Sequence, residues 1–430
     1  MSPSSIKIWF VLLSVTLSLM AAVIMAEFSL GVMEKRQRKS LLDYADTVGP
    51  QGLGRGGYLR ENFKAYVTDG VGGKVRWVTN SAGFRSDQEF SEEPPPGVLR
   101  LLSLGDSFTA GYRVGQEETF SYLLQQWIKQ KFGKSEILVA EIEEPATGLY
   151  YLDRFGIKFN PHLVLLGITL GNDIAQAYHS LDGEEKYVLS LKDGKVRIDL
   201  ADHGQVHWAQ DLRAYKIPAE YLQPRNPVAK FLAPARRWLG KRQVVRRLYP
   251  HEEPITSSGN RDNPELFDLN NGLGMYTNPA APEIDEAYRC LFRILEAFQV
   301  YCEQRQIVFA IQLFPQRFQI QPEDWERAVA ACGLERSRFD LMAPNKRIQA
   351  FCREQGIFCF DPTAAMAQYY AQTKENLYKP RGDMHWNREG HWVFFECSRE
   401  FFAVLVPKGL EAAKARNVWL LPAQARSHPQ

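Results

Sequence analysis

Two short polar segments far apart in the chain carry residue types that together could activate a serine hydroxyl. Ser107 follows Gly105 and Asp106 at the end of an apolar run, and Asp383 and His385 stand one residue apart near the C-terminus. A serine hydroxyl is a weak nucleophile until a neighbouring base takes its proton. A histidine ring is suited to that role because it titrates near neutral pH, and an aspartate on its other nitrogen would fix its tautomer. These residues predict acyl transfer through Ser107.

Acyl transfer also needs hydrogen-bond donors that face the oxyanion of the tetrahedral intermediate, and each such donor typically contributes about 3–4 kcal/mol. The candidates are the backbone N–H of Ser107, the backbone N–H of Gly148 and the side-chain amide of Asn172. Glycine at position 148 would let the backbone approach a substrate closely. No phosphate-binding glycine loop follows a predicted strand. The serine, the histidine, the aspartate and these donors supply the groups that acyl transfer needs, so the predicted reaction requires no metal and no organic cofactor.

The elements that must position these residues alternate along the chain. Apolar runs predict strands, and amphipathic segments between them predict helices. Such alternation is typical of a parallel sheet covered by helices, in which ligands bind at the carboxyl ends of the strands. The predicted strands cover residues 99–104, 136–142, 162–168, 307–313 and 356–360, and the main helices cover 120–133, 284–302, the surroundings of 348–353 and the residues after 387.

The chain divides into five predicted parts. Residues 1–30 form a transmembrane anchor, 31–97 a polar lead-in segment with a Pro-rich linker, 98–410 the α/β domain with an insertion at about 175–278, and 411–430 a tail. The stretch from Ile8 to Ala26 is uncharged and long enough to cross a bilayer, although a cleavable signal peptide is the competing interpretation. The positive-inside rule would place the main domain in the cytoplasm, because basic residues follow the anchor at Lys35, Arg36, Arg38 and Lys39.

Composition excludes some partners. The net charge of +2 gives no general attraction to nucleic acid. None of the six cysteines forms a Cys-x-x-Cys pair, which argues against zinc ribbons and thioredoxin-like sites. The insertion carries a basic amphipathic stretch, residues 234–250, whose candidate roles are contact with a membrane surface or polyanion and simple packing over the sheet.

The segments GDSFTAG, Gly148, LGND and DMHWN together resemble the conserved blocks of SGNH hydrolases, also called GDSL-type esterases. The resemblance implies a three-layer, flavodoxin-like α/β/α fold with a five-stranded parallel sheet. It also implies Ser107 as nucleophile, Gly148 and Asn172 as oxyanion donors, and Asp383 and His385 as the remaining triad. The single residue between Asp383 and His385 is similar to bacterial members linked to polysaccharide O-acetylation, and NSAGFRSD at 80–87 resembles the lead-in of many bacterial members.

The resemblance leaves three functions open. The first is hydrolysis of an acyl ester on a carbohydrate or lipid, by an esterase or deacetylase. The second is O-acyl transfer to a cell-envelope polysaccharide with the same triad, and the third is a non-catalytic carbohydrate-binding protein that keeps the fold. The resemblance also implies an extracytoplasmic catalytic domain on a single-pass anchor, in conflict with the basic residues after that anchor.

Overall fold

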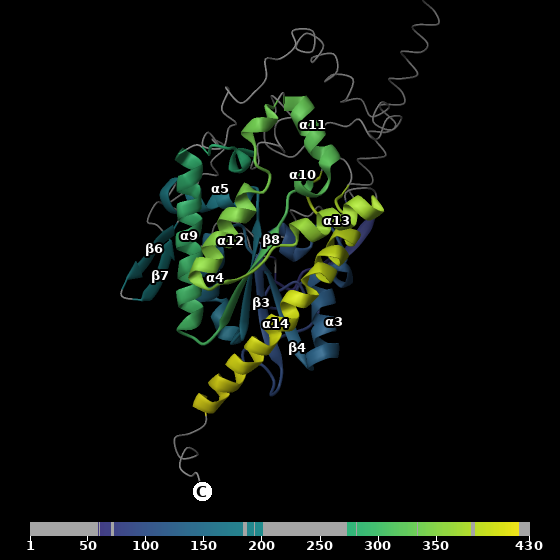
Figure 1. Cartoon of the computed structure of the whole chain (residues 1–430). Helices are drawn as coiled ribbons and strands as arrows, with labels where there is room; N and C mark the ends of the chain where they lie inside the picture. Colours follow the sequence, from purple (N-terminus) through teal and green to yellow (C-terminus); the bar gives the residue numbers. More distant parts are fainter. Residues whose placement is uncertain are drawn as a thin grey trace, which may run out of the picture.

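Five parallel strands form the central sheet of the protein (Figure 1). The computed structural model describes residues 59, 61–69, 73–183, 187–192, 194–200, 273–280, 282–332, 334–379 and 383–420. The strand order is β4-β3-β5-β8-β9. The bounds are β3 Leu99–Gly105, β4 Ser135–Glu141, β5 Leu163–Thr169, β8 Val308–Phe314 and β9 Phe358–Phe360. All five lie within a few residues of the predicted strands, and the predicted α/β fold with a five-stranded parallel sheet is confirmed.

Both faces of the sheet are buried, which explains why its strands are almost continuously apolar. Val164 and Leu166 point into one core and Leu163 and Leu165 into the other, because successive side chains of a strand alternate between faces. Helices cover each face. The first face carries α4 Pro145–Arg154, α5 Asn172–Tyr178, α9 Pro282–Glu303 and α12 Ala343–Gln355, and the second carries α3 Phe120–Phe132, α13 Thr363–Thr373 and α14 Arg388–Leu420.

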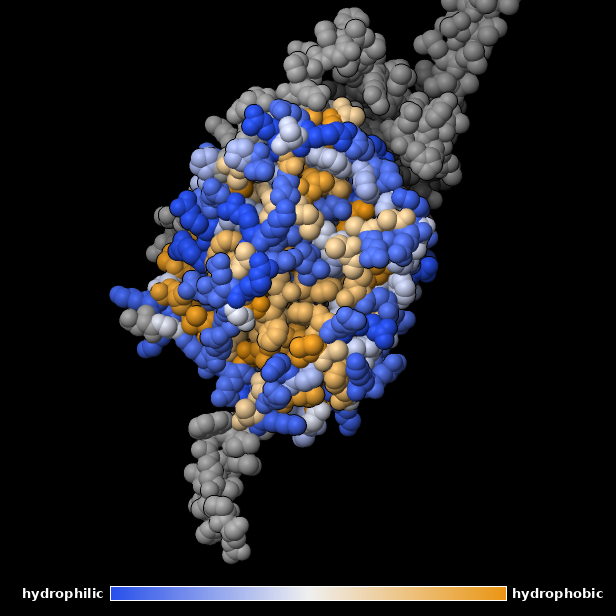
Figure 2. Space-filling model, in the orientation of Figure 1, coloured by the Kyte–Doolittle hydropathy of each residue, from blue (hydrophilic) through white to orange (hydrophobic). Residues whose placement is uncertain are grey.

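Shorter elements connect these layers, and the helices keep a polar side toward solvent. Figure 2 shows apolar residues between α12 and α14 on the viewed face, with hydrophilic residues around them. The connecting elements are α2 Ser107–Ala110, η2 Gln116–Glu118, η3 Gly156–Phe159, η4 His179–Gly183, η7 Leu273–Tyr276, α10 Arg317–Ile320, α11 Pro322–Cys332 and η8 Arg336–Arg338.

The winding of the sheet reverses beside β3. The chain passes from β3 to β4 on one side and then returns to form β5 on the other side of β3. In open parallel sheets, ligands bind at the carboxyl ends of strands where the winding reverses. This topology brings the segments after β3 and β5, and with them Ser107 and Asn172, to the same edge of the sheet.

The lead-in segment contributes a packed element that the sequence did not predict. Strands β1 Lys64–Thr68 and β2 Lys74–Val78 form an antiparallel hairpin. Val67 and Trp77 of this hairpin are buried against Leu59 and against Ala110 at the end of α2. At least part of the predicted lead-in, 31–97, is therefore packed against α2 of the α/β domain.

Other predicted parts fall wholly or partly beyond the described residues. The anchor at Ile8–Ala26 and the basic stretch 234–250 lie outside them, and among the described residues no helix is long and apolar enough to cross a membrane. The described start of the insertion forms the antiparallel hairpin of β6 Tyr187–Lys192 and β7 Lys195–Leu200. Helix α14 continues to Leu420, into the predicted tail.

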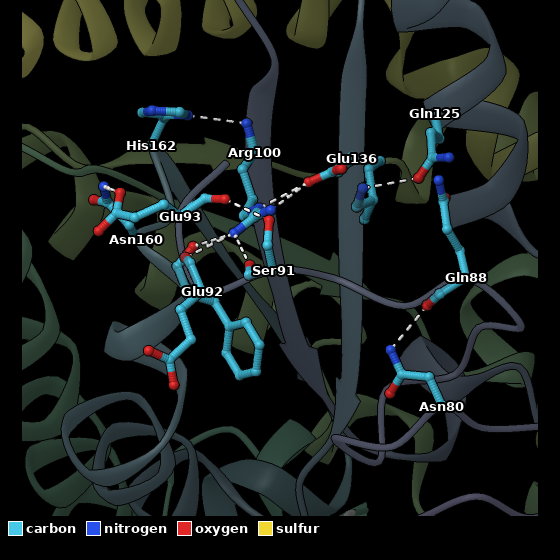
Figure 3. A network of polar contacts seen from close by, with 12 residues as sticks. Asn80, Gln88, Ser91, Glu92, Glu93, Arg100, Gln125, Glu136, Asn160 and His162 are labelled. Atoms are coloured by element: carbon cyan, nitrogen blue, oxygen red, sulfur yellow. Dashed lines mark hydrogen bonds and ion pairs between the residues drawn. The ribbon is translucent and has the colours of Figure 1, made fainter. Parts of the chain in front are cut away.

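A buried arginine organises the edge of the sheet opposite the carboxyl ends (Figure 3). Arg100 of β3 is fully buried, forms an ion pair of 2.6 Å with Glu136, and donates to the carbonyl oxygens of Ser91 and Phe159. The backbone N–H of Arg100 donates to Nδ1 of His162 at 2.9 Å. Burial, together with the positive charges of Arg416 and Arg100, lowers the pKa of His162 to about 4. His162 is therefore neutral in the folded protein at neutral pH.

This neutral histidine is expected to make the fold acid-sensitive. Because the folded pKa of His162 lies below the unfolded value of about 6.5, the unfolded state binds more protons between about pH 6.5 and pH 4, and stability falls as pH falls through that window. In His162→Asn, the amide oxygen replaces Nδ1 as acceptor but does not titrate. Urea unfolding at pH 7 and pH 5 is expected to show about 2 kcal/mol less destabilisation by acid in this variant. Equal loss of stability from pH 7 to pH 5 in both proteins would contradict the lowered pKa of His162 in the folded state.

Candidate active site

The turn after β3 presents Ser107 at the sheet edge. Asp106 caps α2, since its carboxylate accepts from the N–H of Phe108 at 2.9 Å, as expected from its sequence position. Gly105 allows the tight turn, because a Cβ there would stand 2.1 Å from Oγ1 of Thr109. Ser107 is the first residue of α2, and the first N–H groups of a helix have no acceptor within the helix. Its backbone N–H thus remains a candidate oxyanion donor.

The segment before α14 carries Asp383 and His385. It is closed by a bridge between Tyr378 and Trp386 and by the N–H of Lys379, which donates to the carbonyl of His385 at 2.8 Å. Trp386 is fully buried and packs edge-on against Phe108 with ring centroids 5.0 Å apart. This packing anchors the residue next to His385 against α2, which carries Ser107.

The structure brings the three predicted triad residues together in one hydrogen-bonded chain. Oγ of Ser107 lies 2.7 Å from Nε2 of His385, and Nδ1 of His385 lies 2.7 Å from Oδ1 of Asp383. The same oxygen accepts from the backbone N–H of His385 at 2.9 Å. The side chains of His385 and Asp383 remain 18% and 26% exposed, so a substrate can reach them. This arrangement allows the ring to accept a proton from Ser107 while Asp383 holds its other nitrogen.

The charge state of Asp383 fits this geometry. Burial by itself would raise the pKa of Asp383, but the hydrogen bonds and charge of His385 and the positive charge of Lys379 hold that pKa below its ordinary value. Asp383 is therefore ionised at neutral pH. An ionised carboxylate accepts the Nδ1–H proton and leaves Nε2 free to act as a base.

Arg317, which the sequence did not single out, supports the segment that carries the aspartate. Its guanidinium donates to the carbonyl of Lys379 at 2.8 Å and to that of Asp383 at 3.3 Å, and it forms an ion pair of 2.5 Å with Asp324. Burial lowers the pKa of Arg317. Arg317 begins the short helix α10, three residues after β8, at the same edge of the sheet as Ser107.

Asn172 begins α5 directly after β5 and lies beside the turn of Ser107. Its side chain is close enough to Asp106 for a hydrogen bond that lowers the pKa of that carboxyl, against the stronger opposite effect of burial. One N–H of its amide donates to Gln176 at 3.2 Å. A side-chain amide has two such protons, so an oxyanion would compete for them with Asp106 and Gln176.

Behind Asn172, two buried carboxyl groups share one threonine. The hydroxyl of Thr169 donates to Asp106 and its backbone N–H donates to Asp173, both at 2.7 Å. Burial raises the pKa of Asp173 well above its ordinary value, and the neighbouring Asp106 raises it further. The segment Gly171–Asp173 thus also supports the turn that holds Ser107, a role that its motif did not reveal.

The prediction that Gly148 supplies an oxyanion donor is wrong. Its N–H donates to the carbonyl of Glu144 at 3.0 Å within α4. A Cβ at this position would lie 2.5 Å from Ile142 and 3.3 Å from Phe298, so the residue faces the core. Strand β4 ends beside Gly105, and Gly148 lies farther on, inside the next helix. The absent side chain serves close packing of α4 on the sheet.

Other candidate groups have structural roles or no visible role. His391, near the start of α14, is buried and accepts from the N–H of Phe120, and its pKa is lowered to about 3, mainly by burial. Within the described residues, no group of three His, Cys, Asp or Glu side chains could hold a metal ion. Four cysteines of the described residues take no part in a disulfide: Cys302, Cys352, Cys359 and Cys397.

Comparisons with known proteins identify no family for this chain. No family model and no curated protein matches its sequence. Among solved structures, an acetyl xylan esterase aligns with 71% of this chain and 100% of its own at 12% identity and a TM-score of 0.35. An acetyl-xylooligosaccharide esterase from a Geobacillus aligns with 71% of this chain and 93% of its own at 11% identity and a TM-score of 0.34.

A third solved structure, a two-domain esterase active on acetylated mannans, aligns with 75% of this chain at 10% identity and a TM-score of 0.31. The chain spans 51% of that esterase. At such low identities and TM-scores these likenesses assign neither a family nor an activity. The functional argument therefore rests on the geometry around Ser107.

Proposed function

We propose that this protein is a serine hydrolase of the SGNH type that cleaves acyl esters through Ser107, His385 and Asp383. The observation that carries the proposal is the hydrogen-bonded chain from Ser107 to His385 to Asp383, with 2.7 Å at both side-chain contacts. Nucleophile, base and orienting acid within hydrogen-bond reach of one another are the signature of covalent acyl transfer. Asn172 and the N–H of Ser107 are the proposed oxyanion donors.

The reaction proceeds in two halves. Oγ of Ser107 attacks the acyl carbonyl while Nε2 of His385 takes its proton, and the imidazolium is stabilised by Asp383. When the tetrahedral intermediate collapses, the ester C–O bond breaks and His385 returns the proton to the leaving alcohol. The O–H of an acceptor, water or an alcohol, then attacks acyl-Ser107 while His385 takes its proton. The bond between the acyl carbon and Oγ breaks, the acyl group stays on the acceptor oxygen, and His385 returns the proton to Oγ of Ser107.

The acceptor decides between the two catalytic functions. Water gives an esterase or deacetylase, and a polysaccharide hydroxyl gives an O-acyltransferase. The resemblance of DMHWN to bacterial members linked to polysaccharide O-acetylation favours a carbohydrate O-acyl group as substrate, with a lipid ester as the second candidate. We further propose that the domain works outside the cytoplasm, held by the predicted anchor at Ile8–Ala26. A reporter that functions only outside the cytoplasm, fused after Gln430, is expected to be active. An inactive fusion, together with activity of a reporter that functions only in the cytoplasm, would contradict this location.

Labelling of the full chain in detergent with a fluorophosphonate probe tests the proposed nucleophile. The unmutated protein is expected to become labelled, because the probe traps a serine that a histidine has activated. Ser107→Ala is expected to lose labelling completely. The matched control Ser190→Ala removes an exposed serine of β6 and should label like the unmutated protein.

Absence of labelling in the unmutated protein would favour the non-catalytic carbohydrate-binding alternative. Retained labelling of Ser107→Ala would place the nucleophile elsewhere. If the unmutated protein becomes labelled, fresh protein without the probe is incubated with a chromogenic acetyl ester and an oligosaccharide, and the products separate the two catalytic functions. Acetate alone indicates a hydrolase, and acetylated oligosaccharide indicates a transferase.

A further inference from the structure

Two aromatic rings lie close to the imidazole of His385. The ring of Tyr112 is stacked on it, with centroids 4.0 Å apart and an angle of 23° between the planes. Phe108 lies near the imidazole at 5.1 Å and 33°. The two hydrogen bonds of His385 fix its two nitrogens, and the aromatic contacts restrict rotation of the ring out of that plane. A flat aromatic face also stabilises a cation lying over it, which is the form that His385 takes when it holds the proton of Ser107.

Tyr112 belongs to a short loop whose backbone is held by basic side chains from two different segments. Nη1 of Arg85 donates to the carbonyl of Ala110 at 2.5 Å, and its Nη2 donates to that of Val114 at 2.8 Å. Nζ of Lys379 donates to the carbonyl of Arg113 at 3.0 Å. The carbonyls on both sides of Tyr112 are thus bonded to charged donors, which form stronger hydrogen bonds than neutral ones.

The loop also contains backbone that needs such support. The two residues that flank Tyr112 have positive φ: 75° at Gly111, before it, and 55° at Arg113, after it. A non-glycine residue with positive φ is uncommon and is maintained by its surroundings. The hydrogen bonds to Arg85 and Lys379 flank this position. They therefore set the direction in which the Tyr112 ring points.

Arg85 is in turn held by the hairpin of the lead-in segment. Its guanidinium carbon lies 3.2 Å from the ring centroid of Trp77, which is fully buried on β2. Tyr112 packs against the apolar cluster that includes Trp77, Val67 and Ala110. A continuous set of contacts runs from the hairpin through Arg85 to the Tyr112 loop and ends on His385.

We infer that Tyr112 is a positioning residue of the proposed reaction: stacked on His385 and held by Arg85 and the β1–β2 hairpin, it keeps the imidazole aligned with Ser107 and stabilises its protonated form. This inference rests on the proposed function. It gives the lead-in segment an indirect role in catalysis, through the contacts of Trp77 with Arg85 and of Arg85 with the Tyr112 loop. Lys379 adds a link between the Tyr112 loop and the segment of Asp383.

The test compares Tyr112→Leu with Tyr112→Phe. Loss of the ring is expected to lower kcat for a chromogenic acetyl ester by about 10²-fold with little change in KM, the effect expected from a misplaced catalytic group. The acidic limb of the pH–rate profile is expected to move to lower pH, because the protonated ring has lost its aromatic neighbour. Tyr112→Phe retains the face and should stay within about threefold of the unmutated protein. The control Trp392→Leu removes an exposed aromatic ring of α14 and should leave both quantities unchanged.

A readout independent of activity separates the inference from the proposed function. Proton NMR should show the ring protons of His385, identified by their absence in His385→Ala, shifted upfield by the stacked ring, and Tyr112→Leu should remove the part of that shift that Tyr112 causes. If the unmutated protein is active but Tyr112→Leu keeps its kcat, pH profile and ring-proton shifts, the inference fails and the proposed function stands. If the unmutated protein is inactive but the upfield shift is present and reduced in Tyr112→Leu, the proposed function fails and the stack is supported.

Discussion

Replacing His385 by alanine is expected to lower kcat for ester cleavage by about 10⁵- to 10⁶-fold, and adding Asp383→Ala to that variant is expected to lower it little further. The reason is that the side chains act as one unit. Without the imidazole, Oγ of Ser107 has lost the base 2.7 Å away, and Asp383 has no ring left to orient. Steady-state kinetics with a chromogenic ester, on His385→Ala, Asp383→Ala and the double variant, measure this non-additivity.

Thermal unfolding of the same variants is the control, because a loss of activity through misfolding would lower the melting temperature as well. His385 is partly exposed, so its removal leaves a small cavity and is expected to change stability little. Additive losses from His385→Ala and Asp383→Ala would show that the two residues act independently. That result would contradict the triad.

Asp383→Asn is expected to lower kcat by about 10⁴-fold while the fold and substrate binding remain intact. Oδ1 of Asp383 accepts from both Nδ1 and the backbone N–H of His385. An amide can turn its NH₂ group toward Nδ1, which leaves the proton on Nε2, where it blocks transfer from Ser107. The neutral amide also stabilises the imidazolium less than a carboxylate does.

The pH profile adds a second criterion for Asp383. Hydrogen bonds and charge from His385 and Lys379 keep the pKa of Asp383 below its ordinary value, so the carboxylate stays ionised until well into the acidic range. The acidic limb of the pH–rate profile of the unmutated protein should therefore not report the titration of Asp383. A loss of tenfold or less in kcat for Asp383→Asn would show that another group orients His385.

Much of the fold follows from local sequence patterns. The strands β3, β5 and β8 were predicted within one residue at their starts and ends, because buried parallel strands are short apolar runs bounded by turn residues. The hairpin β1–β2 was missed because each of its strands is only five residues long and carries exposed polar residues between the buried ones. Its one buried face packs against a distant partner, Ala110. Local periodicity carries no information about such a partner.

The site divides in the same way. By itself, the sequence determined which residue types stand beside the predicted elements. That was sufficient to select Ser107 and Asn172, which follow strands, and Asp383 and His385, which precede the last helix. It could not determine the direction of a backbone N–H. Gly148 satisfied the residue type, but its N–H lies within the hydrogen bonding of α4.

Only the tertiary structure decided which side chains support Ser107. Its contact with His385 joins residues 278 positions apart. The stack of Tyr112, the bonds of Arg85 and the bonds of Arg317 likewise join segments far apart in the chain. Such contacts depend on the order of strands in the sheet and on the packing of loops at its edge, which no local pattern encodes. Sequence motifs thus predicted the groups that are proposed to react, and three-dimensional packing determined how those groups are aligned.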